Sequence, residues 1–523
     1  MAWSGTISGN VSCAYDKDFR IVSQSINNEN TISLAYDDPD GLLTKVGDFR
    51  LVYHTASGLL TGTIHGAFHD FLSYNDFGEV ANYRATYNSN DIFEVAYTTD
   101  RLGRIIEKRE TVGGEAHTYR YSYDHVGQLI EVKTDGLLTA HYEYDSNGNR
   151  LSRSTTTETT NGTYDAQDRL TRYGGNTYRY TANGELEEKN DNDGTTIYTY
   201  TALSALRTAT LPDGRKIEYV LDGQERRIGK KVDDVLVQGF LYENTIKPVA
   251  ELDSSNRIVA RFVYAGGNTP DYVIKNGHTY QIVSDHLGSP RLVIDISTGN
   301  IVQKMEYDEY GRLLLDTNPG FQPFGFAGGI YDRDTGLLQF GLREYDPETG
   351  RWTSKDPIDF DGGDSNLYRY VQNDPVNYAD STGLSMNMLK TGISWLSPID
   401  PFAIMEGYND YWNRTILGDY SGAAMALALL SLEVNPGTSK AKKAAKAAKG
   451  VSKKLIKKGT DDIIEIAKFS GKGNKKTYKH WILEKDYSAG KPTAHRGSYW
   501  KLKNKNDKGF RRTLTKDGRI VDD

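Results

Sequence analysis

One short pattern recurs along the first part of this 523-residue chain. An aromatic segment precedes a polar Asp/Asn/Gly turn and an alternating segment follows it, as in "YTTDRLGRIIEKRET" from Tyr97, "YSYDHVGQLIEVKTDG" from Tyr121 and "YEYDSNGNRLSRSTT" from Tyr142. Spacings of 21, 20, 16, 20 and 19 residues separate the marker tyrosines Tyr123, Tyr144, Tyr164, Tyr180, Tyr200 and Tyr219. Each period therefore predicts one β-hairpin.

Stacking of these hairpins decides the fold class. A lone hairpin cannot bury its apolar face, so the repeats must pair edge to edge into a continuous antiparallel sheet. Composition agrees, because Tyr (36) and Gly (52) are abundant and Pro (14) is scarce. Such a mixture suits short strands joined by glycine turns. We therefore predict a mainly β body.

Charge divides the chain near residue 385. From there to the C-terminus, 27 Lys+Arg stand against 14 Asp+Glu, which leaves a net charge of −20 for residues 1–384. An acidic body joined to a basic tail indicates different partners, and attraction between the two parts. A single cysteine, Cys13, excludes an internal disulfide framework. The first residues lack the pattern of a secretory signal, so we expect export to use another route.

Over about residues 10–384 the repeats resemble the YD repeats of Rhs proteins, wall-associated repeat proteins, Tc toxin C subunits and teneurins. The segments "DHLGSPRLVID" (Asp285 to Asp295) and "YDEYGRLL" (Tyr307 to Leu314) are similar to that family's terminal units. The resemblance implies a spiralling β-sheet shell over residues 1–335, whose last turn curls inward as a plug. It also implies that the shell encloses the chain's own C-terminal domain. Shells of the family use many more repeats, so we expect a partial shell.

Residues 336–384, which include "GLREYDPETGRWTSKDP" and "DSTGL", resemble the Rhs-associated core. The resemblance implies an autoproteolytic site in which Asp356 and Asp380 are the carboxylates, Arg343 is the supporting cation and the chain is cut after Leu384. Two carboxylates that share a proton can divide the roles of base and acid. A guanidinium can hold and orient one of them.

Two features weigh against this assignment. Without the surrounding match, aspartates at 356 and 380 are more often ordinary turn residues. The family's DPxG pattern is also altered twice, because Asp359 replaces a usual glycine and Ser381 replaces a usual proline. Losing a proline loosens a turn and losing a glycine can change one.

Beyond Leu384 the YD pattern ends. Residues 385–459 favour a helical linker, and residues 460–523 favour a small α+β domain with Asp-Gly turns. In this family the position after the core is occupied by a variable toxin, so we expect a toxin here. The candidate catalytic residues are His480, His495, Arg496, Ser498 and Arg511, with Tyr499 and Trp500 available to stack on a base.

Histidines with arginines supply the base, acid and phosphate-binding cations that RNA cleavage requires, so a metal-independent ribonuclease is favoured and no cofactor is expected. A deoxyribonuclease toxin is one alternative. A structural or adhesive surface repeat protein is another. For a polymorphic toxin used in interbacterial competition, the expected partners are a cognate immunity protein, RNA or DNA in the target cell, and a secretion apparatus or delivery protein. The expected location is outside the producing cell or inside the target cell.

Overall fold

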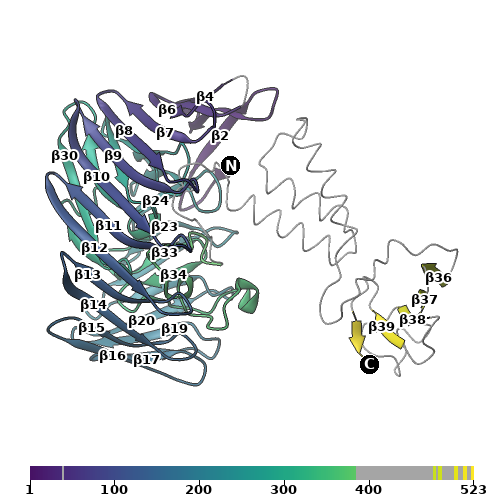
Figure 1. Cartoon of the computed structure of the whole chain (residues 1–523). Helices are drawn as coiled ribbons and strands as arrows, with labels where there is room; N and C mark the ends of the chain where they lie inside the picture. Colours follow the sequence, from purple (N-terminus) through teal and green to yellow (C-terminus); the bar gives the residue numbers. More distant parts are fainter. Residues whose placement is uncertain are drawn as a thin grey trace. The chain divides into compact units, whose positions relative to one another are not determined.

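The computed structural model describes residues 1–37 and 41–384, together with five strands between residues 475 and 522. The chain divides into two compact units, Met1–Pro398 and Ile399–Asp523, which are described separately. The first unit is almost wholly β (Figure 1). In the part of the chain that the structure describes, no helix is long and apolar enough to cross a membrane.

Strands β1 to β31 pair in chain order, each antiparallel to the next, in one continuous sheet. This confirms the prediction of a single stacked-hairpin sheet. The strands are β1 (Ala2–Trp3), β2 (Gly9–Tyr15), β3 (Ile21–Ile26), β4 (Glu29–Tyr36), β5 (Leu43–Val46), β6 (Phe49–Tyr53), β7 (Leu60–His65), β8 (Phe68–Tyr74), β9 (Val80–Tyr87), β10 (Asn90–Thr99), β11 (Ile105–Val112), β12 (Glu115–Tyr123), β13 (Leu129–Thr134), β14 (Leu137–Tyr144), β15 (Arg150–Ser154), β16 (Thr159–Tyr164), β17 (Leu170–Tyr173), β18 (Asn176–Tyr180), β19 (Leu186–Asp191), β20 (Gly194–Tyr200), β21 (Leu206–Thr210), β22 (Lys216–Leu221), β23 (Arg227–Val232), β24 (Val235–Tyr242), β25 (Pro248–Leu252), β26 (Ile258–Val263), β27 (Tyr272–Lys275), β28 (His278–Ser284), β29 (Pro290–Asp295), β30 (Ile301–Tyr307) and β31 (Leu313–Asp316).

The repeated tyrosine and aspartate have separate structural tasks. In the turn after β12, Asp124 Oδ1 accepts the backbone N–H groups of Val126, Gly127 and Gln128 at 3.0, 2.8 and 2.9 Å. The tyrosine before the turn donates its hydroxyl to a backbone carbonyl of the preceding hairpin, as from Tyr144 to Leu129 O at 2.7 Å. The aspartate therefore closes its turn, and the tyrosine ties its repeat to the one before it.

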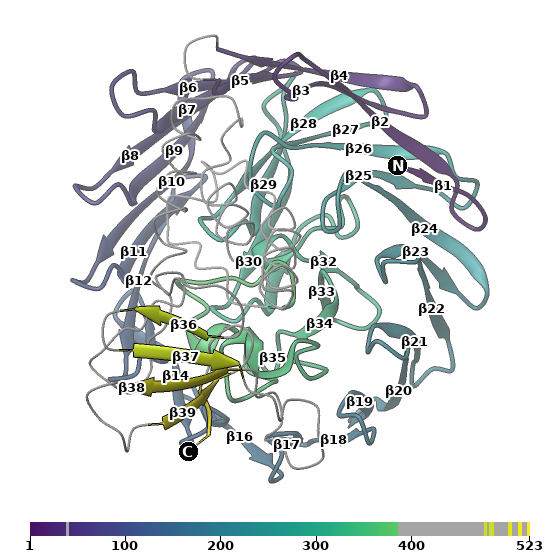
Figure 2. The ribbon, with the colours of Figure 1, turned by 90° about the vertical axis from the view of Figure 1, so that its right-hand side faces the viewer.

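The sheet winds into an inward spiral. Figure 2 shows the strands following one another round a ring, and β2 packs against β24, where the second pass begins. Side-chain hydrogen bonds join the two passes, with sequence separations of 237 (Gln24 with Arg261), 226 (Val46 with Tyr272), 216 (His65 with Gln281), 209 (Tyr87 with Ile296), 181 (Glu110 with Arg291) and 166 (Tyr144 with Tyr310). The separation falls steadily because the second pass covers the same arc with fewer residues, as a path of smaller radius must.

The chain after β31 curls inside the ring (Figure 2). It forms a small antiparallel sheet of β32 (Ile330–Tyr331), β33 (Leu338–Phe340), β34 (Arg343–Asp346) and β35 (Arg351–Trp352), with the 3-10 helices η1 (Phe326–Gly328), η2 (Asp359–Gly362) and η3 (Val371–Asn373). Its centre is an aromatic cluster that includes Phe326, Phe340, Tyr345, Trp352 and Tyr370. The inward-curled plug that the resemblance implied is present, and we refer to residues 320–384 as the core segment.

Buried amide side chains fix the core segment to the turns of the sheet. Asn377 Oδ1 accepts the N–H of Ile105 at 2.8 Å, and Asn373 Nδ2 donates to Gly148 O at 2.8 Å. Asn366 Nδ2 donates to Asn149 Oδ1 at 2.8 Å. These bonds reach the turns that follow β10 and β14, so the position of the core segment is set by the sheet around it.

The second unit contains an antiparallel sheet of β36 (Lys475–Tyr478), β37 (Trp481–Lys485), β38 (Trp500–Asn504), β39 (Arg511–Leu514) and β40 (Ile520–Asp522). It lies within the region predicted to be a small α+β domain. The predicted helical linker 385–459 and the helix predicted to start near residue 460 lie outside the described residues.

Candidate functional site

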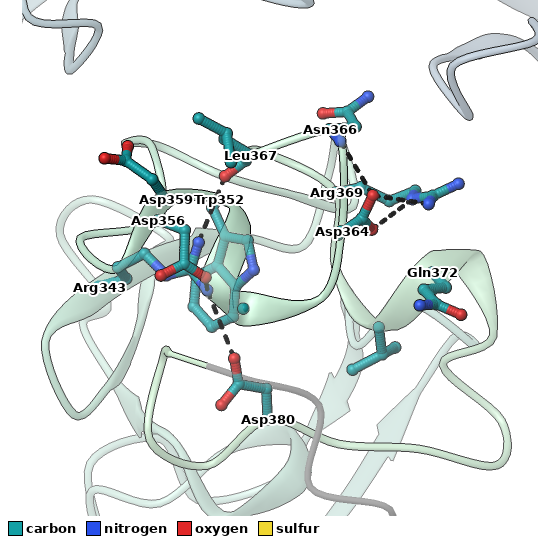
Figure 3. A pocket seen from close by; sticks show the side chains of 12 residues that line it. Arg343, Trp352, Asp356, Asp359, Asp364, Asn366, Leu367, Arg369, Gln372 and Asp380 are labelled. Atoms are coloured by element: carbon teal, nitrogen blue, oxygen red, sulfur yellow. Dashed lines mark hydrogen bonds and ion pairs between the residues drawn. The ribbon is translucent and has the colours of Figure 1, made fainter. Parts of the chain in front are cut away.

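The core segment brings the three predicted autocleavage residues together. Arg343 lies on β34, Asp356 follows β35 and Asp380 follows η3. Figure 3 shows the side chains of Asp356 and Asp380 on either side of the Arg343 guanidinium. Arg343 Nη2 lies 2.8 Å from Asp356 Oδ2 and 3.4 Å from Asp380 Oδ2. One guanidinium nitrogen therefore bridges two carboxylates that are 24 positions apart in the sequence.

Arg343 is held on every side. It is 2 % exposed, its Cζ atom lies 4.1 Å from the ring centroid of Trp352, and its Nη1 donates to Leu367 O at 3.3 Å. Its Nε donates to the carbonyl oxygen of Gly383, next to the predicted cleavage point. The planar guanidinium thus binds both carboxylates and the backbone next to the predicted cleavage point in one fixed geometry.

Asp380 shapes the residues that precede the predicted cut. Its Oδ1 accepts the backbone N–H groups of Thr382, Gly383 and Leu384 at 3.2, 2.9 and 3.3 Å, and the Thr382 hydroxyl at 2.9 Å. This is the arrangement that the aspartates of the sheet turns adopt. Its Oδ2 is left to face Arg343.

Gly383 is required by the close packing of this turn on β33 and β34. Its φ is +68°, and a Cβ atom there would lie 2.4 Å from Phe340 O. Leu342 donates its N–H to Thr382 O at 3.3 Å. The Gly-Leu sequence therefore presses the chain against the strand that carries Arg343.

Asp356 lies beside the carbonyl that would be attacked. A Cβ atom built on Gly362 would meet Asp356 Oδ2 at 2.8 Å and Leu384 O at 3.1 Å, so both oxygens approach the same point. A cavity of about 30 Å³ adjoins Asp356 and Gly362, and Arg343 and Asp380 also line it. That volume accommodates a water molecule.

Burial perturbs all three groups. It raises the pKa of Asp356 to about 6, against the opposing charge of Arg343. It also raises the pKa of Asp380, although Arg343 and the hydrogen bonds to Oδ1 oppose it, and it lowers the pKa of the Arg343 guanidinium. Carboxyl groups with raised pKa values can exchange protons near neutral pH.

The two departures from the family pattern have different structural results. Asp359 adopts φ +49°, a left-handed conformation that Asp tolerates better than most residues, so the turn survives the loss of glycine. Ser381 is buried, and its hydroxyl has no hydrogen-bond partner among the residues that the structure describes. The turn at Asp380 keeps its hydrogen bonds without the proline.

The structure does not test the predicted catalytic residues of the toxin. His480, His495, Arg496 and Ser498 lie outside the described residues, as does Tyr499. Arg511 begins β39 and Trp500 begins β38, but only their backbone is described. Within residues 1–37 and 41–384, no group of three or more His, Cys, Asp or Glu could hold a metal ion.

The sequence analysis did not identify three residues that contribute to the site. They are Trp352 beneath the guanidinium, Gly362 against Asp356 and Leu384, and Thr382, whose hydroxyl accepts the Leu384 N–H at 3.3 Å. A signal for the last was present, since "DSTGL" repeats the D-x-x-G spacing of turns such as "DHVGQ".

Comparison with known proteins decides the family. Residues 2–376 match the teneurin YD-shell family. The chain belongs to this family. It is 30% identical to mouse (Mus musculus) teneurin-4 over 412 residues, covering 75% of this chain and 14% of that protein. It is 24% identical to Drosophila melanogaster teneurin-m over 383 residues, with 70% and 14% covered. The chain thus spans about 14% of the length of these relatives.

Solved toxin structures share the fold. The Tc holotoxin pore of Photorhabdus luminescens aligns with a TM-score of 0.54 at 19% identity, covering 74% of this chain and 22% of that chain. TcdB2-TccC3 without its hypervariable C-terminal region aligns with a TM-score of 0.53 at 20% identity, covering 72% and 21%. The TM-scores of these alignments support a common YD-repeat shell architecture.

Proposed function

We propose that this protein is a YD-repeat shell that cuts its own chain between Leu384 and Ser385 and so releases a C-terminal payload. The observation that carries the proposal is that Arg343 bridges Asp356 and Asp380 beside residues 383–384, with Asp356 Oδ2 and Leu384 O both close to Gly362. The enclosed position, the small cavity and the raised carboxyl pKa values support hydrolysis of the chain's own peptide bond.

The two carboxylates divide the proton transfers. Asp380, ionised, accepts a proton from water as the water oxygen bonds to the Leu384 carbonyl carbon, while Asp356, protonated, donates to the carbonyl oxygen. Collapse of the tetrahedral intermediate breaks the C–N bond: Asp380 passes the proton it took from water to the Ser385 nitrogen, which leaves as an amine, and the hydroxyl formed from the carbonyl oxygen returns its proton to Asp356. Arg343 holds the two carboxylates and Gly383 O in place.

The proposed payload is residues 385–523, a basic toxin that acts on RNA. Three features support it: the change from net negative to net positive charge at the cut, the position after an Rhs-like core, and the run "KPTAHRGSYWKLKNK". Cations would bind the phosphates and His495 would transfer the proton, with Arg496, Ser498, His480 and Arg511 as further candidate residues. Use in interbacterial competition, a secretion apparatus and an immunity protein belong to the same proposal.

Mass spectrometry of the purified full-length chain tests the cut. We expect a fragment that begins at Ser385, and no fragment from the Asp356→Asn variant. Asp361→Asn changes an exposed carboxylate in the same loop and should cut normally. A chain that stays intact, or an Asp356→Asn chain that is cut, contradicts the assignment.

Degradation of total RNA by residues 385–523 in the presence of a chelator tests the payload. His495→Ala should abolish it. Degraded DNA with a divalent metal, beside intact RNA, would assign the payload to the deoxyribonuclease alternative instead.

A structural or adhesive role is the second candidate, because the chain belongs to the teneurin YD-shell family. Expression of residues 385–523 alone inside bacteria separates the two. Growth arrest supports a toxin, whereas normal growth with the fragment present supports the structural role.

A further inference from the structure

A second cavity contains a buried arginine that is not neutralised. It measures about 270 Å³ and lies between strands β14 to β18, the turn that follows β30 and the turn between β34 and β35. We call it the Arg150 cavity. Arg150 lines it, is 3 % exposed and forms no ion pair among the described residues.

Aromatic rings hold the Arg150 guanidinium by its faces. Its Cζ lies 3.8 Å from the ring centroid of Tyr310 and 5.0 Å from that of Tyr142. Gly350 of the core segment leaves space for it, since a Cβ there would lie 1.9 Å from Nη2. Ring contacts stabilise the charge, and the Tyr310 hydroxyl approaches the guanidinium, but Nε and Nη2 are left without an acceptor among the described residues.

Three buried polar atoms of this cavity lack partners in the described part of the chain. They are Nε and Nη2 of Arg150 and the hydroxyl of Tyr173. A buried donor without an acceptor is costly, and a buried charge without a counter-charge more so. The cavity therefore presents a guanidinium and a phenol that an anion would satisfy together.

The charges around the cavity favour a singly charged ligand. Of its three carboxylates, Asp308 pairs with Arg312 at 3.2 Å and Glu348 pairs with Lys189 at 2.7 Å. Arg153 is attracted by the carboxylates of Glu309 and Asp308, and Glu158 is exposed. Arg150 is therefore the buried cation of the lining that has no carboxylate partner among the described residues.

We propose that the Arg150 cavity binds a carboxylate. The guanidinium matches a carboxylate in shape and charge, Tyr173 adds a hydroxyl donor, and the tyrosine rings enclose the carbon skeleton. The ligand is either a small free carboxylate or a glutamate or aspartate side chain of a polypeptide. Because sheet and core segment both line the cavity, the ligand links them. This proposal is independent of the cut at Leu384.

Calorimetric titration of the full-length chain tests it with two probes, sodium acetate and N-acetylglutamate amide, against sodium chloride at equal ionic strength. Saturable binding of both probes with similar affinity indicates a free carboxylate. Much tighter binding of the glutamate probe indicates a polypeptide side chain. Absence of saturable binding by either probe overturns the proposal.

Variants locate the binding. Arg150→Met should weaken it by about 10- to 100-fold, the effect of losing a charge-assisted bond. Tyr173→Phe keeps the ring and should weaken binding by about 3- to 10-fold. Arg120→Met removes an exposed arginine and should leave binding unchanged. If Arg150→Met does not fold, Arg150→Lys and Tyr173→Phe decide, and unchanged affinity in both contradicts the site.

Discussion

The turn at Asp124–Gln128 in the sheet and the turn at Asp380–Leu384 in the core segment share a design. In both, Oδ1 of the first aspartate accepts the N–H groups two, three and four positions later, and a glycine with positive φ stands fourth. The partner of Oδ2 differs. Asp124 binds the Gln128 side chain of its own turn, whereas Asp380 faces Arg343 from a distant strand.

This difference shows how a structural turn becomes a candidate for chemistry. In the sheet, the fifth residue of the turn is polar and satisfies the aspartate locally. In the core segment the fifth residue is Leu384, which is buried, so the second carboxylate oxygen is left to a shared guanidinium beside another carboxylate. The backbone bonds set the turn in both regions, and the partner of Oδ2 separates them: a neutral amide of the same turn for Asp124 and a distant guanidinium for Asp380.

Replacing Asp380 or Asp124 with asparagine should give the largest difference in processing rate between the two turns. Asp380→Asn takes away the proposed base, so processing at Leu384 should slow by about 100- to 10,000-fold. Asp124→Asn should leave processing at the native rate. The fraction cut over time, from intact mass, measures both, and equal rates in the two variants would remove the distinction between the turns.

Matched glycine substitutions should give a smaller contrast. Gly383→Ala puts a methyl group against Phe340 O and displaces the scissile carbonyl, so we expect processing to slow by about 10- to 100-fold. A Cβ on Gly127 meets only Arg104 Nη1 at 4.0 Å, so Gly127→Ala should cost about 1 kcal/mol of stability from its positive φ alone. Processing rates and thermal unfolding of both variants check this.

The pH dependence of processing sharpens the assignment of roles. Asp356 must be protonated to donate, and its pKa is raised to about 6. The rate should therefore fall as pH rises above this value, by about tenfold per unit once Asp356 is mostly ionised. A rate that rises through the same range would assign the base role to Asp356 and the acid role to Asp380.

A buried carboxyl in the sheet should affect stability but not processing. Asp70 accepts the Thr63 N–H at 2.5 Å and the Tyr83 hydroxyl at 3.3 Å, and burial raises its pKa to about 7. Because this folded-state value exceeds the unfolded one, its contribution to stability is present at low pH and is lost as pH rises to about 7.

Asp70→Asn should consequently raise Tm by a few degrees at about pH 8 and much less at about pH 5. Thermal unfolding at the two pH values checks this. A gain of equal size at both would show that the ionisation of Asp70 is not the cause.

The repeats could be predicted from the sequence because their signals are local. Tyr, the turn aspartate and glycine recur with the hairpin period, and consecutive hairpins have no other way to bury their faces. The trio Arg343, Asp356 and Asp380 was reached through resemblance, since spacing alone did not distinguish catalytic from turn aspartates. The autocleavage that this implied stays a prediction.

Contacts between distant segments could not be predicted. The bond between Asn149 and Asn366 joins residues 217 positions apart, and the Arg150 guanidinium meets rings from two passes of the spiral. Such pairs depend on the radius of the spiral, which no short window of sequence encodes. The catalytic roles predicted for His480, His495, Arg496, Ser498 and Arg511 also stay predictions, because the structure does not describe the side chains of these residues.

The burial of residues 380–384 within the fold carries a kinetic consequence. A proteolytic centre filled by its own chain performs a unimolecular reaction, so its rate does not depend on protein concentration. After the cut, the new Leu384 carboxylate would remain where the peptide bond was, because Asp380 and Arg343 hold the preceding residues by hydrogen bonds. A second substrate could not enter, and the centre would act once in the lifetime of each molecule.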